Sequence, residues 1–370
     1  MSGYQLAREF RRLDQTAPLL LITADDGRYY SKPQLSTALT HCKTSDTLTT
    51  ATAEAMATQL NATLRTHTHV NTIDTHNKMI LLDNEKIPYE KLVIACGADV
   101  IKPPLKGNGV EDVLSINHIY HYSTFQDLIK NKKNITILGA GLIGCEFAND
   151  LSNIDYEVHV IAPVNAPLDL LVPEKIGLIL QQALEQNGVV FHLNCVAERV
   201  DKTAAGYCLT LSNDKKLNTE FVLSAIGLKP HIELVINTPI KTNRGIIVNR
   251  YLETNIQTIY ALGDCAEVEG HVLPFITPLL NCSRALAKTL AGERTAVDYP
   301  AMPVVVKTPA HPIVVCPPPK TITGSWEITQ DNNSARALFY SADRKLHGFV
   351  LTNEAVKERT NLVKQIPALF

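Results

Sequence analysis

Residues 135–151 read Ile-Thr-Ile-Leu-Gly-Ala-Gly-Leu-Ile-Gly-Cys-Glu-Phe-Ala-Asn-Asp-Leu, and this stretch decides the fold. A short apolar strand runs directly into Gly139, Gly141 and Gly144, and a helix-forming segment follows. In this context the first glycine permits a tight turn, the second lets the backbone approach a pyrophosphate, and the third lets helix and strand pack closely. The phosphates then lie at the helix N-terminus, where free N–H groups and the helix dipole favour negative charge. The stretch therefore predicts an NAD(P)-binding βαβ unit.

The end of the next predicted strand, residues 157–161, leaves the choice of nicotinamide coenzyme open. An acidic residue there accepts hydrogen bonds from the ribose of NAD, and a nearby arginine accommodates the 2′-phosphate of NADP. The strand is followed by Ala162, Pro163 and Val164, which supply neither group. This strand end therefore does not decide between NADH and NADPH.

A second glycine loop is expected at the start of the chain, where only its tail is present. Gly3 precedes a predicted helix, and the strand after that helix ends at Ala24 and Asp25. These segments are the second half of a βαβ unit, so we expect that the first strand of this domain and two loop glycines are missing. We interpret Met1 as an internal methionine rather than as the mark of a true truncation. A true loss would leave buried backbone groups unpaired at about 1–3 kcal/mol each, and would put dinucleotide binding by this domain of the literal chain in doubt.

Alternating strands and helices predict an α/β fold with parallel sheets. We expect residues 1–116 and 239–298 to form one Rossmann-like dinucleotide-binding domain and residues 117–238 to form a second, NAD(P)-binding one; the resemblance described below implies that the first of them binds FAD. Residues 299–370 change to several strands followed by a helix, which predicts a C-terminal α+β domain.

Composition argues against several function classes. Of the 370 residues 19% are charged and the net charge is −2, which disfavours a strongly basic nucleic-acid-binding protein. No apolar run reaches the roughly 18 to 20 residues that a membrane span needs. The eight cysteines form no Cys-x-x-Cys pair, so neither a metal site nor a short-spaced redox-active disulphide is predicted. Scattered cysteines without a secretory signal suggest reduced thiols in a cytoplasm.

A further signal is a strand that ends at Gly263 and Asp264, followed after a loop by a predicted helix over residues 278–290. An aspartate in this place can accept hydrogen bonds from a polyol, and the helix N-terminus can stabilise negative charge on a reduced ring. An aspartate in a plain β-turn is the alternative interpretation.

With these motifs the chain resembles the pyridine nucleotide–disulphide oxidoreductases, flavoprotein reductases with two dinucleotide domains, and in particular their rubredoxin-reducing branch. The matching segments are residues 24–28, 30–36, 139–150, 260–267 and 306–309. The resemblance implies that NADH passes a hydride to FAD, which then releases single electrons to rubredoxin, a small acidic iron protein that supplies bacterial alkane hydroxylation. Ferredoxin-type acceptors stay open.

The resemblance also implies which residues form the reacting site. Lys32, Glu146 and Lys307 are expected at the flavin ring, with Lys32 and Glu146 meeting beside it and Glu146 bordering the nicotinamide. A lysine there offsets the charge of a hydride-reduced ring, and a carboxylate holds the lysine in place. The other implied FAD contacts follow the cofactor from its adenosine to its ring: Gly3, Ala24, Asp25 at the ribose, Val70 at the adenine, Asp264 at the ribitol and Ile276 at the isoalloxazine.

Two other functions stay open. A single-cysteine NADH oxidase, NADH peroxidase or coenzyme A disulphide reductase has the same architecture, and Cys42 is the only candidate nucleophile near the right region. No cysteine lies within residues 35–37, where such enzymes carry theirs, so a structural or surface role for Cys42 is favoured. The non-enzymatic alternative is a flavin-free NAD-binding remnant.

Overall fold

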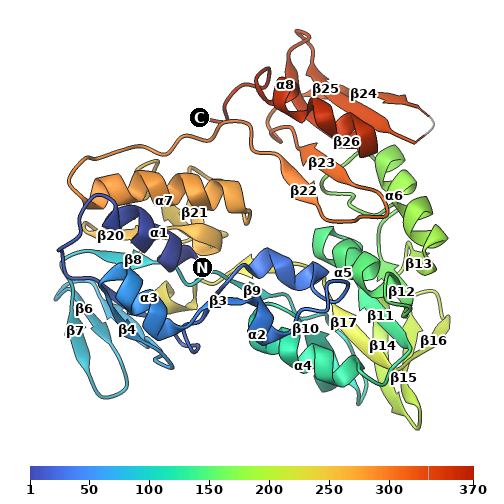
Figure 1. Ribbon diagram of the computed structural model, residues 1–370, viewed down its shortest axis with the longest axis horizontal. Coiled ribbons are helices and arrows are strands. Elements are labelled where there is room, and N and C mark those ends of the chain that lie inside the picture. The colour runs from blue at the N-terminus through green and yellow to red at the C-terminus, as the bar shows by residue number, and fades with distance from the viewer. Residues whose placement is uncertain (332) are drawn as a thin grey trace.

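The computed structural model describes residues 1–331 and 333–370, and it has a mixed α/β architecture in three parts (Figure 1). The predicted fold class is confirmed. No helix among the described residues combines the length and the apolar character that a membrane crossing requires.

The middle part is built on a five-stranded parallel sheet around the glycine loop. The strand order is β10–β17–β11–β12–β13. Parallel neighbours need crossovers, and helices connect β10 to β11, β11 to β12 and β12 to β13, whereas β14, β15 and β16 connect β13 to β17. One face packs Ile135 and Val160 against Phe125 and Phe147 of the helices. A small antiparallel sheet, β14–β15–β16, covers the other face. The elements are β10 (Leu114–Ser115), α4 (Ile119–Ile129), β11 (Asn134–Leu138), α5 (Leu142–Ser152), β12 (Glu157–Ala162), α6 (Glu174–Gln186), β13 (Val189–Leu193), β14 (Ala197–Thr203), β15 (Gly206–Leu211), β16 (Lys216–Thr219) and β17 (Phe221–Ser224).

The first part contains the parallel strand pairs β1–β4, β8–β20 and β19–β21. Because β8 precedes the middle part in sequence and β20 follows it, the chain returns to the first part after the middle part. Figure 1 shows α7 lying beside α1, although the two are far apart in sequence. A strand ahead of Met1 stays a prediction. The elements before the crossing are α1 (Ser2–Arg11), β1 (Leu20–Ile22), β2 (Tyr29–Tyr30), the 3-10 helix η1 (Lys32–Thr37), α2 (Ser45–Leu48), β3 (Thr49–Ala51), α3 (Ala53–Leu60), β4 (Thr63–Arg65), β5 (Thr72–Asp74), β6 (Met79–Leu81), β7 (Lys86–Pro88), β8 (Leu92–Ile94), β9 (Ala98–Val100) and η2 (Val110–Asp112). Those after it are β18 (Leu228–Pro230), η3 (Glu233–Val235), β19 (Ile246–Val248), β20 (Ile259–Ala261), η4 (Gly263–Cys265), β21 (Ala266–Val268) and α7 (Ile276–Leu290).

Helix α7 begins at Ile276, two residues before the predicted start at Pro278. A proline in the first helical turn is tolerated because the N–H groups of that turn have no partner within the helix. The predicted helix is therefore present and ends where expected, at Leu290, but it begins two residues earlier than predicted.

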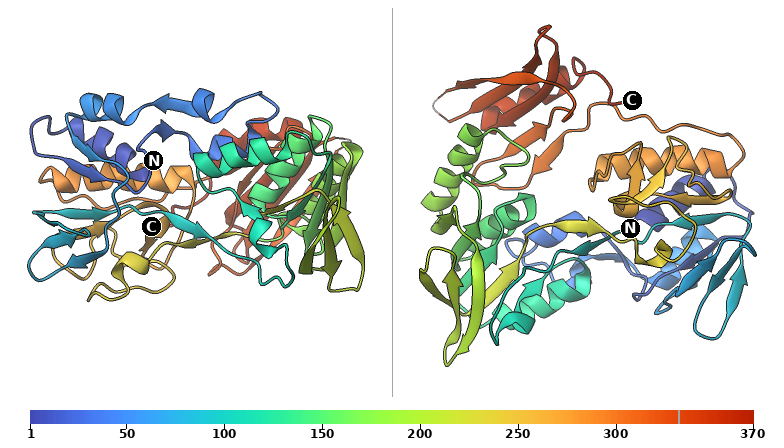
Figure 2. Two further views of the ribbon diagram at one scale, coloured as in Figure 1. Left: turned by 90° about the horizontal axis from the view of Figure 1, so that it is seen from below. Right: turned by 180° about the vertical axis from the view of Figure 1, so that it is seen from behind.

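The C-terminal part is an antiparallel five-stranded sheet of order β22–β23–β26–β25–β24. Val306, Val315 and Val350 from one face of this sheet join the same apolar cluster as helix α5, so the part packs on the middle sheet's helices. Figure 2 shows the extended segment that joins α7 to β22. The elements are β22 (Val304–Val306), β23 (Ile313–Cys316), β24 (Gly324–Gln330), β25 (Ala335–Ser341), β26 (Leu346–Thr352), η5 (Asn353–Glu358) and α8 (Arg359–Val363).

Candidate active site

The three glycines of the loop differ in what surrounds them. Gly139 has a φ of +107°, and a Cβ there would lie 2.6 Å from the carbonyl oxygen of Ala225. A Cβ on Gly144 would lie 2.0 Å from the carbonyl oxygen of Gly139, so only glycine fits there. A Cβ on Gly141 would meet no described atom within 4 Å apart from the adjacent backbone, which leaves the approach that a pyrophosphate needs. The geometry of the loop is therefore compatible with the predicted roles: a tight turn at Gly139, a pyrophosphate approach at Gly141 and close helix packing at Gly144.

Helix α5 carries a buried polar stripe behind this loop. Glu146, Asn149 and Asp150 lie three and four positions apart, so they share one helix face. All three are buried among apolar residues of the same helix. Because a buried polar group costs free energy unless it is hydrogen-bonded, this stripe needs polar partners from neighbouring parts of the chain.

Glu146 joins all three parts of the molecule. Its carboxylate lies 2.6 Å from Lys307 Nζ, accepts from Ser36 Oγ at 2.5 Å, and accepts from the backbone N–H of Lys307 at 3.0 Å. The Lys307 ammonium also donates to Ser36 Oγ at 2.9 Å and to the carbonyl oxygen of Pro33. Ser36 and Pro33 belong to η1, and Lys307 follows β22. The buried carboxylate therefore ties a segment of the first part and the C-terminal part to α5.

The other two members of the stripe fix the same neighbours. The carboxylate of Asp150 accepts from the backbone N–H groups of Leu39 at 2.8 Å and Thr40 at 3.0 Å. The side-chain oxygen of Asn149 accepts from the backbone N–H of Ala310 at 3.0 Å. Helix α5 thus positions the end of η1 and the loop between β22 and β23.

The structure corrects the expected contact between Lys32 and Glu146. Within residues 1–331 and 333–370, the ion-pair partner of Glu146 is Lys307, and Lys32 makes no ion pair. Lys32 is the first residue of η1, four positions before Ser36, so it leaves the helix on another side. Burial lowers the pKa of Lys32, and the carboxylates of Asp264 and Asp99 oppose that shift. Lys32 therefore lies toward Asp264.

The first turn of α1, which contains Gly3, lies between two loops that carry carboxylates. A Cβ on Gly263 would lie 2.6 Å from Ser2 Oγ, so the loop with Asp264 touches this turn. On the other side Tyr4 Oη donates to the carbonyl oxygen of Gly27 at 2.5 Å. Because a helix N-terminus attracts phosphate, the turn is a candidate site for the diphosphate of a second dinucleotide.

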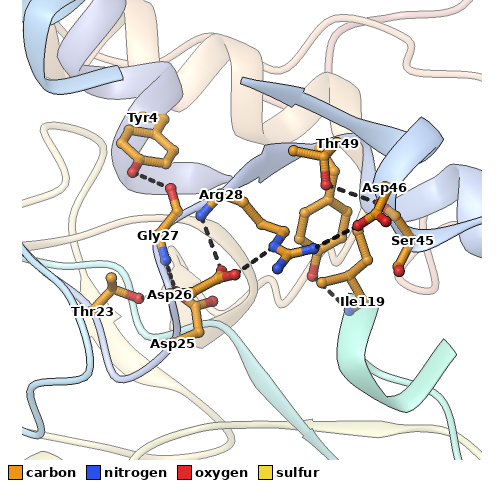
Figure 3. Close-up of polar contacts among 11 residues, drawn as sticks. Tyr4, Thr23, Asp25, Asp26, Gly27, Arg28, Ser45, Asp46, Thr49 and Ile119 are labelled. Carbon is orange, nitrogen blue, oxygen red and sulfur yellow. Dashed lines mark hydrogen bonds and ion pairs between the residues drawn. The ribbon is translucent and has the colours of Figure 1, made fainter. Parts of the chain in front are cut away.

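The turn after β1 presents Asp25 in a defined orientation (Figure 3). Its carboxylate accepts from Thr23 Oγ1 at 2.6 Å and from the backbone N–H of Gly27 at 3.0 Å. Arg28 forms an ion pair with Asp26 and closes the turn. Asp25 itself is exposed, as is Ala24, so the carboxylate is accessible to a ribose.

The remaining predicted contacts lie at other edges of the first part. Val70 is half-buried in the loop between β4 and β5. Ile276 is the first residue of α7 and is 39% exposed, which is high for a large apolar side chain. Among the described residues, neither of these two forms a hydrogen bond with Glu146 or Lys307.

The residues present fit FAD and a nicotinamide dinucleotide. Asp264 is half-buried, and burial raises the pKa of its carboxyl. Among residues 1–331 and 333–370 no protein hydrogen-bond donor meets this carboxylate, so the hydroxyl groups of a ribitol chain would supply what it lacks. With the open approach to Gly141 and the helix N-terminus at Gly3, the fold and the site define a flavin- and nicotinamide-dependent oxidoreductase with two dinucleotide domains.

Comparison with known proteins agrees with this class. Residues 1–277 match the family of pyridine nucleotide-disulphide oxidoreductases, and residues 296–366 match the rubredoxin binding C-terminal domain. The chain belongs to the pyridine nucleotide-disulphide oxidoreductase family. The predicted resemblance is confirmed, and FAD and NAD(H) are the cofactors of this family.

Relatives match over nearly the whole chain. Rubredoxin-NAD(+) reductase from Alcanivorax borkumensis is 48% identical over 371 residues, which cover 100% of this chain and 97% of the relative. Nitric oxide reductase FlRd-NAD(+) reductase from Aliivibrio fischeri is 36% identical and covers 99% and 96%. NADH:rubredoxin oxidoreductase from Clostridium acetobutylicum has a similar fold, with a TM-score of 0.81, 22% identity, and coverage of 99% and 92%.

Sequence reasoning missed Ser36, Asn149 and Asp150. A signal for two of them was available, because polar residues at positions i, i+3 and i+4 of an otherwise apolar helix must find buried partners. For Ser36 no local signal exists, since its partners Glu146 and Lys307 are 110 and 271 positions away.

Replacement of Asp264 by asparagine is expected to affect stability and flavin binding in opposite directions. The raised pKa of Asp264 means that stability of the flavin-free protein falls as pH rises through that pKa. Asparagine cannot ionise, so the variant should lose less stability than the wild type between acidic and neutral pH. Flavin affinity should weaken roughly 10- to 100-fold through the lost charge-assisted hydrogen bonds.

Thermal unfolding of the flavin-free proteins across pH and flavin titration would measure both effects. Asp127→Asn, at an exposed position of α4, should change neither. Equal pH profiles for Asp264→Asn and wild type would contradict the expectation.

Proposed function

We propose that this chain is an NADH-dependent flavoprotein reductase that delivers electrons to rubredoxin. The observation that supports this most is the match of residues 296–366 to a rubredoxin-binding domain, joined in one chain to a reductase core. Two relatives named rubredoxin-NAD(+) reductase, at 48% and 42% identity, align with all of this chain.

Each part of the chain has a binding task in this proposal. Bound FAD would take a hydride from NADH and give up electrons one at a time. The helix N-terminus at Gly3 and the carboxylate of Asp25 hold the adenosine half of FAD, and Asp264 holds the ribitol. Residues 139–144 hold the pyrophosphate of NADH at the N-terminus of α5. Val70 meets the adenine, and Ile276 lies against the ring.

The Lys307–Glu146–Ser36 cluster positions a cation beside the reacting groups. An ammonium offsets negative charge that accumulates next to it, and a buried carboxylate holds that ammonium in place. Glu146 lies on the helix that starts at the glycine loop, and the N–H of Lys307 is bonded to it at 3.0 Å. Lys32, which lies toward Asp264, supplies a second cation in the flavin region.

The physiological setting is a further part of the same proposal. We propose that the reduced rubredoxin supplies alkane hydroxylation in a cytoplasm. In the same proposal residues 1–116 and 239–298 bind FAD, residues 117–238 bind NADH, and residues 299–370 contribute the acceptor side. Because rubredoxins are acidic, the acceptor surface should be rich in lysine and arginine.

Stopped-flow measurement tests the proposal. Mixing with NADH should bleach the flavin absorbance within the turnover time, and added rubredoxin should then be reduced. Flavin bleaching followed by fast transfer to ferredoxin and none to rubredoxin would overturn the acceptor. A purified protein without flavin absorbance would favour the NAD-binding remnant.

The single-cysteine alternative predicts a thiol at the reacting centre. The residue bonded to Glu146 is Ser36 and not a cysteine, whereas Cys42 is exposed beyond the end of η1, which supports the thiol-free proposal. Cys42→Ser is therefore expected to leave the rate of NADH oxidation with rubredoxin within about twofold of wild type, an effect below 0.5 kcal/mol. Steady-state kinetics of this variant beside Cys208→Ser would check it. Loss of activity in Cys42→Ser alone would revive the thiol-based alternative.

A further inference from the structure

Two cysteines meet beside the loop that carries Asp264. Strands β8 and β20 pair in parallel, and the N–H of Leu262 donates to the carbonyl oxygen of Ile94 at 3.1 Å. Cys96 lies in the turn after β8, and Cys265 is the last residue of η4, next to Asp264. Cys265 Sγ donates to the same oxygen of Ile94 at 3.6 Å. The two cysteines, far apart in sequence, are therefore neighbours at the ends of paired strands.

A hydrogen bond joins the two sulphur atoms, with Cys96 as the donor. This bond raises the pKa of the Cys96 thiol. It lowers the pKa of the Cys265 thiol, burial opposes that shift, and the backbone N–H groups of Gly97 and Cys96 add to it. Cys265 is fully buried, whereas Cys96 is exposed. The pair thus combines a sulphur that readily holds negative charge with one that reagents in solution can reach.

Cys96 also lies where the chain crosses between the first and the middle part. Its Sγ donates to the carbonyl oxygen of His231 at 3.1 Å, and the N–H of His231 donates to the carbonyl oxygen of Gly97 at 2.9 Å. These residues flank the pair of β9 and β18, the strands that carry the chain out of the first part and back into it. A covalent change at Cys96 would therefore act on both crossings and on the loop with Asp264.

We propose that Cys96 and Cys265 form a redox-active dithiol, which hydrogen peroxide closes to a disulphide that slows reduction of the flavin by NADH. Hydrogen peroxide is a two-electron oxidant, and the dioxygen chemistry of flavins is a source of it close to the pair. The disulphide would tie the crossing strands to the Asp264 loop and remove the S–H that bonds to His231. The inference goes beyond the proposed function, because it concerns the response of the protein to an oxidant.

The oxidation balances in atoms and electrons. When the pair is singly ionised it shares one proton, and a thiolate forms on Cys96 when that proton passes to Cys265. The thiolate attacks one oxygen of the peroxide, the O–O bond breaks and hydroxide leaves, which gives a sulphenic acid on Cys96. The Cys265 sulphur then attacks the oxidised sulphur, so that an S–S bond forms as the S–O bond breaks. The two thiol protons convert the two hydroxides to water, and the two electrons lost by sulphur are gained by the peroxide.

Thiol titration of the flavin-loaded protein is the first test. All eight cysteines are free. Treatment with a small excess of hydrogen peroxide, then catalase and unfolding, should lower the thiol count from eight to six, and peptide mapping should find Cys96 linked to Cys265. Cys42→Ser, the matched control at another exposed cysteine, should form the same link. The absence of this link in the treated wild type, or a link that uses Cys42 instead, would overturn the proposal.

Stopped-flow reduction of the flavin by NADH measures the consequence. Peroxide treatment should lower the wild-type rate roughly fivefold or more, the low end of the usual coupling between two sites. Dithiothreitol, which is itself oxidised to a cyclic disulphide, should restore it. Cys96→Ser should have the rate of the untreated protein and keep it after peroxide. Because Cys265 is buried and its replacement could disturb packing, Cys265→Ala serves as the second variant, with the treated and untreated samples of each variant compared.

An equal loss of rate in wild type and Cys96→Ser would assign the effect to other residues and contradict the proposal. A linked wild-type protein with an unchanged rate would contradict it as well. If the untreated protein showed no flavin reduction by NADH, the proposed function would fail, and the thiol count would still decide whether the disulphide forms.

Discussion

Replacing Glu146 with alanine is expected to destabilise the protein by about 3 kcal/mol and to slow flavin reduction by NADH. The carboxylate is fully buried, and Lys307 Nζ and Ser36 Oγ both depend on it. Removing it leaves a partly buried ammonium without its counter-charge, and the loss can be larger than the net worth of the pair. Lys307 is 32% exposed, so water recovers part of this cost and the lower end of the range applies.

Denaturant unfolding of Glu146→Ala beside Glu90→Ala, an exposed glutamate, would measure the effect. Lys307→Met and the double variant complete a cycle. Each single variant leaves one charge of the pair without its partner, whereas the double variant leaves neither. The double variant should therefore be more stable than the sum of the two single effects predicts. If the two single losses of stability simply added up in the double variant, Glu146 and Lys307 would not interact in solution. Glu146 would then not tie the C-terminal part to α5.

Gly141→Ala is expected to fold normally and to raise the KM for NADH about a hundredfold, an effect near 2.7 kcal/mol. The backbone at Gly141 has φ −76° and ψ −171°, which alanine adopts without strain. Apart from the adjacent backbone, no described atom lies within 4 Å of the added Cβ, so the methyl group enters the open space before the helix N-terminus. That space is where the pyrophosphate is predicted to lie, and the methyl group would displace it.

Gly144→Ala provides the contrast. Its Cβ would lie 2.0 Å from the carbonyl oxygen of Gly139, so the helix and the loop must separate. We expect destabilisation of about 1–3 kcal/mol or more, the usual cost of overpacking. Melting temperatures and NADH kinetics would separate the two variants, with chemical reduction of the flavin by dithionite as control. A Gly141→Ala protein with an unchanged KM would place the coenzyme elsewhere.

The local parts of the site could be predicted from sequence because they lie within one continuous segment. A strand, three spaced glycines and a helix predict the loop at residues 139–144, and a strand ending in Gly263 and Asp264 predicts the second carboxylate loop. Each depends on backbone geometry that neighbouring residues impose. The misplaced start of α7 has the same origin, since the first turn of a helix tolerates the proline that local reasoning takes as its limit.

The partner of Glu146 could not be predicted in this way. A flavin-site lysine was expected to pair with it, and Lys32 was assigned although Lys307 holds that place. Nothing in the order of residues distinguishes Lys32 from Lys307 as the partner of Glu146. The partner is the lysine that the packing of α5, η1 and β22 brings close to the Glu146 carboxylate.

The amino-acid order alone therefore determined the class of fold, the coenzyme loop and the neutrality of the segment after β12, because spacing and charge within a segment do not depend on distant contacts. Only the tertiary structure decided that Ser36, Glu146 and Lys307 form one cluster. A contact across 161 positions arises when buried polar groups from separate segments must satisfy one another, and this requirement exists only once the segments pack together.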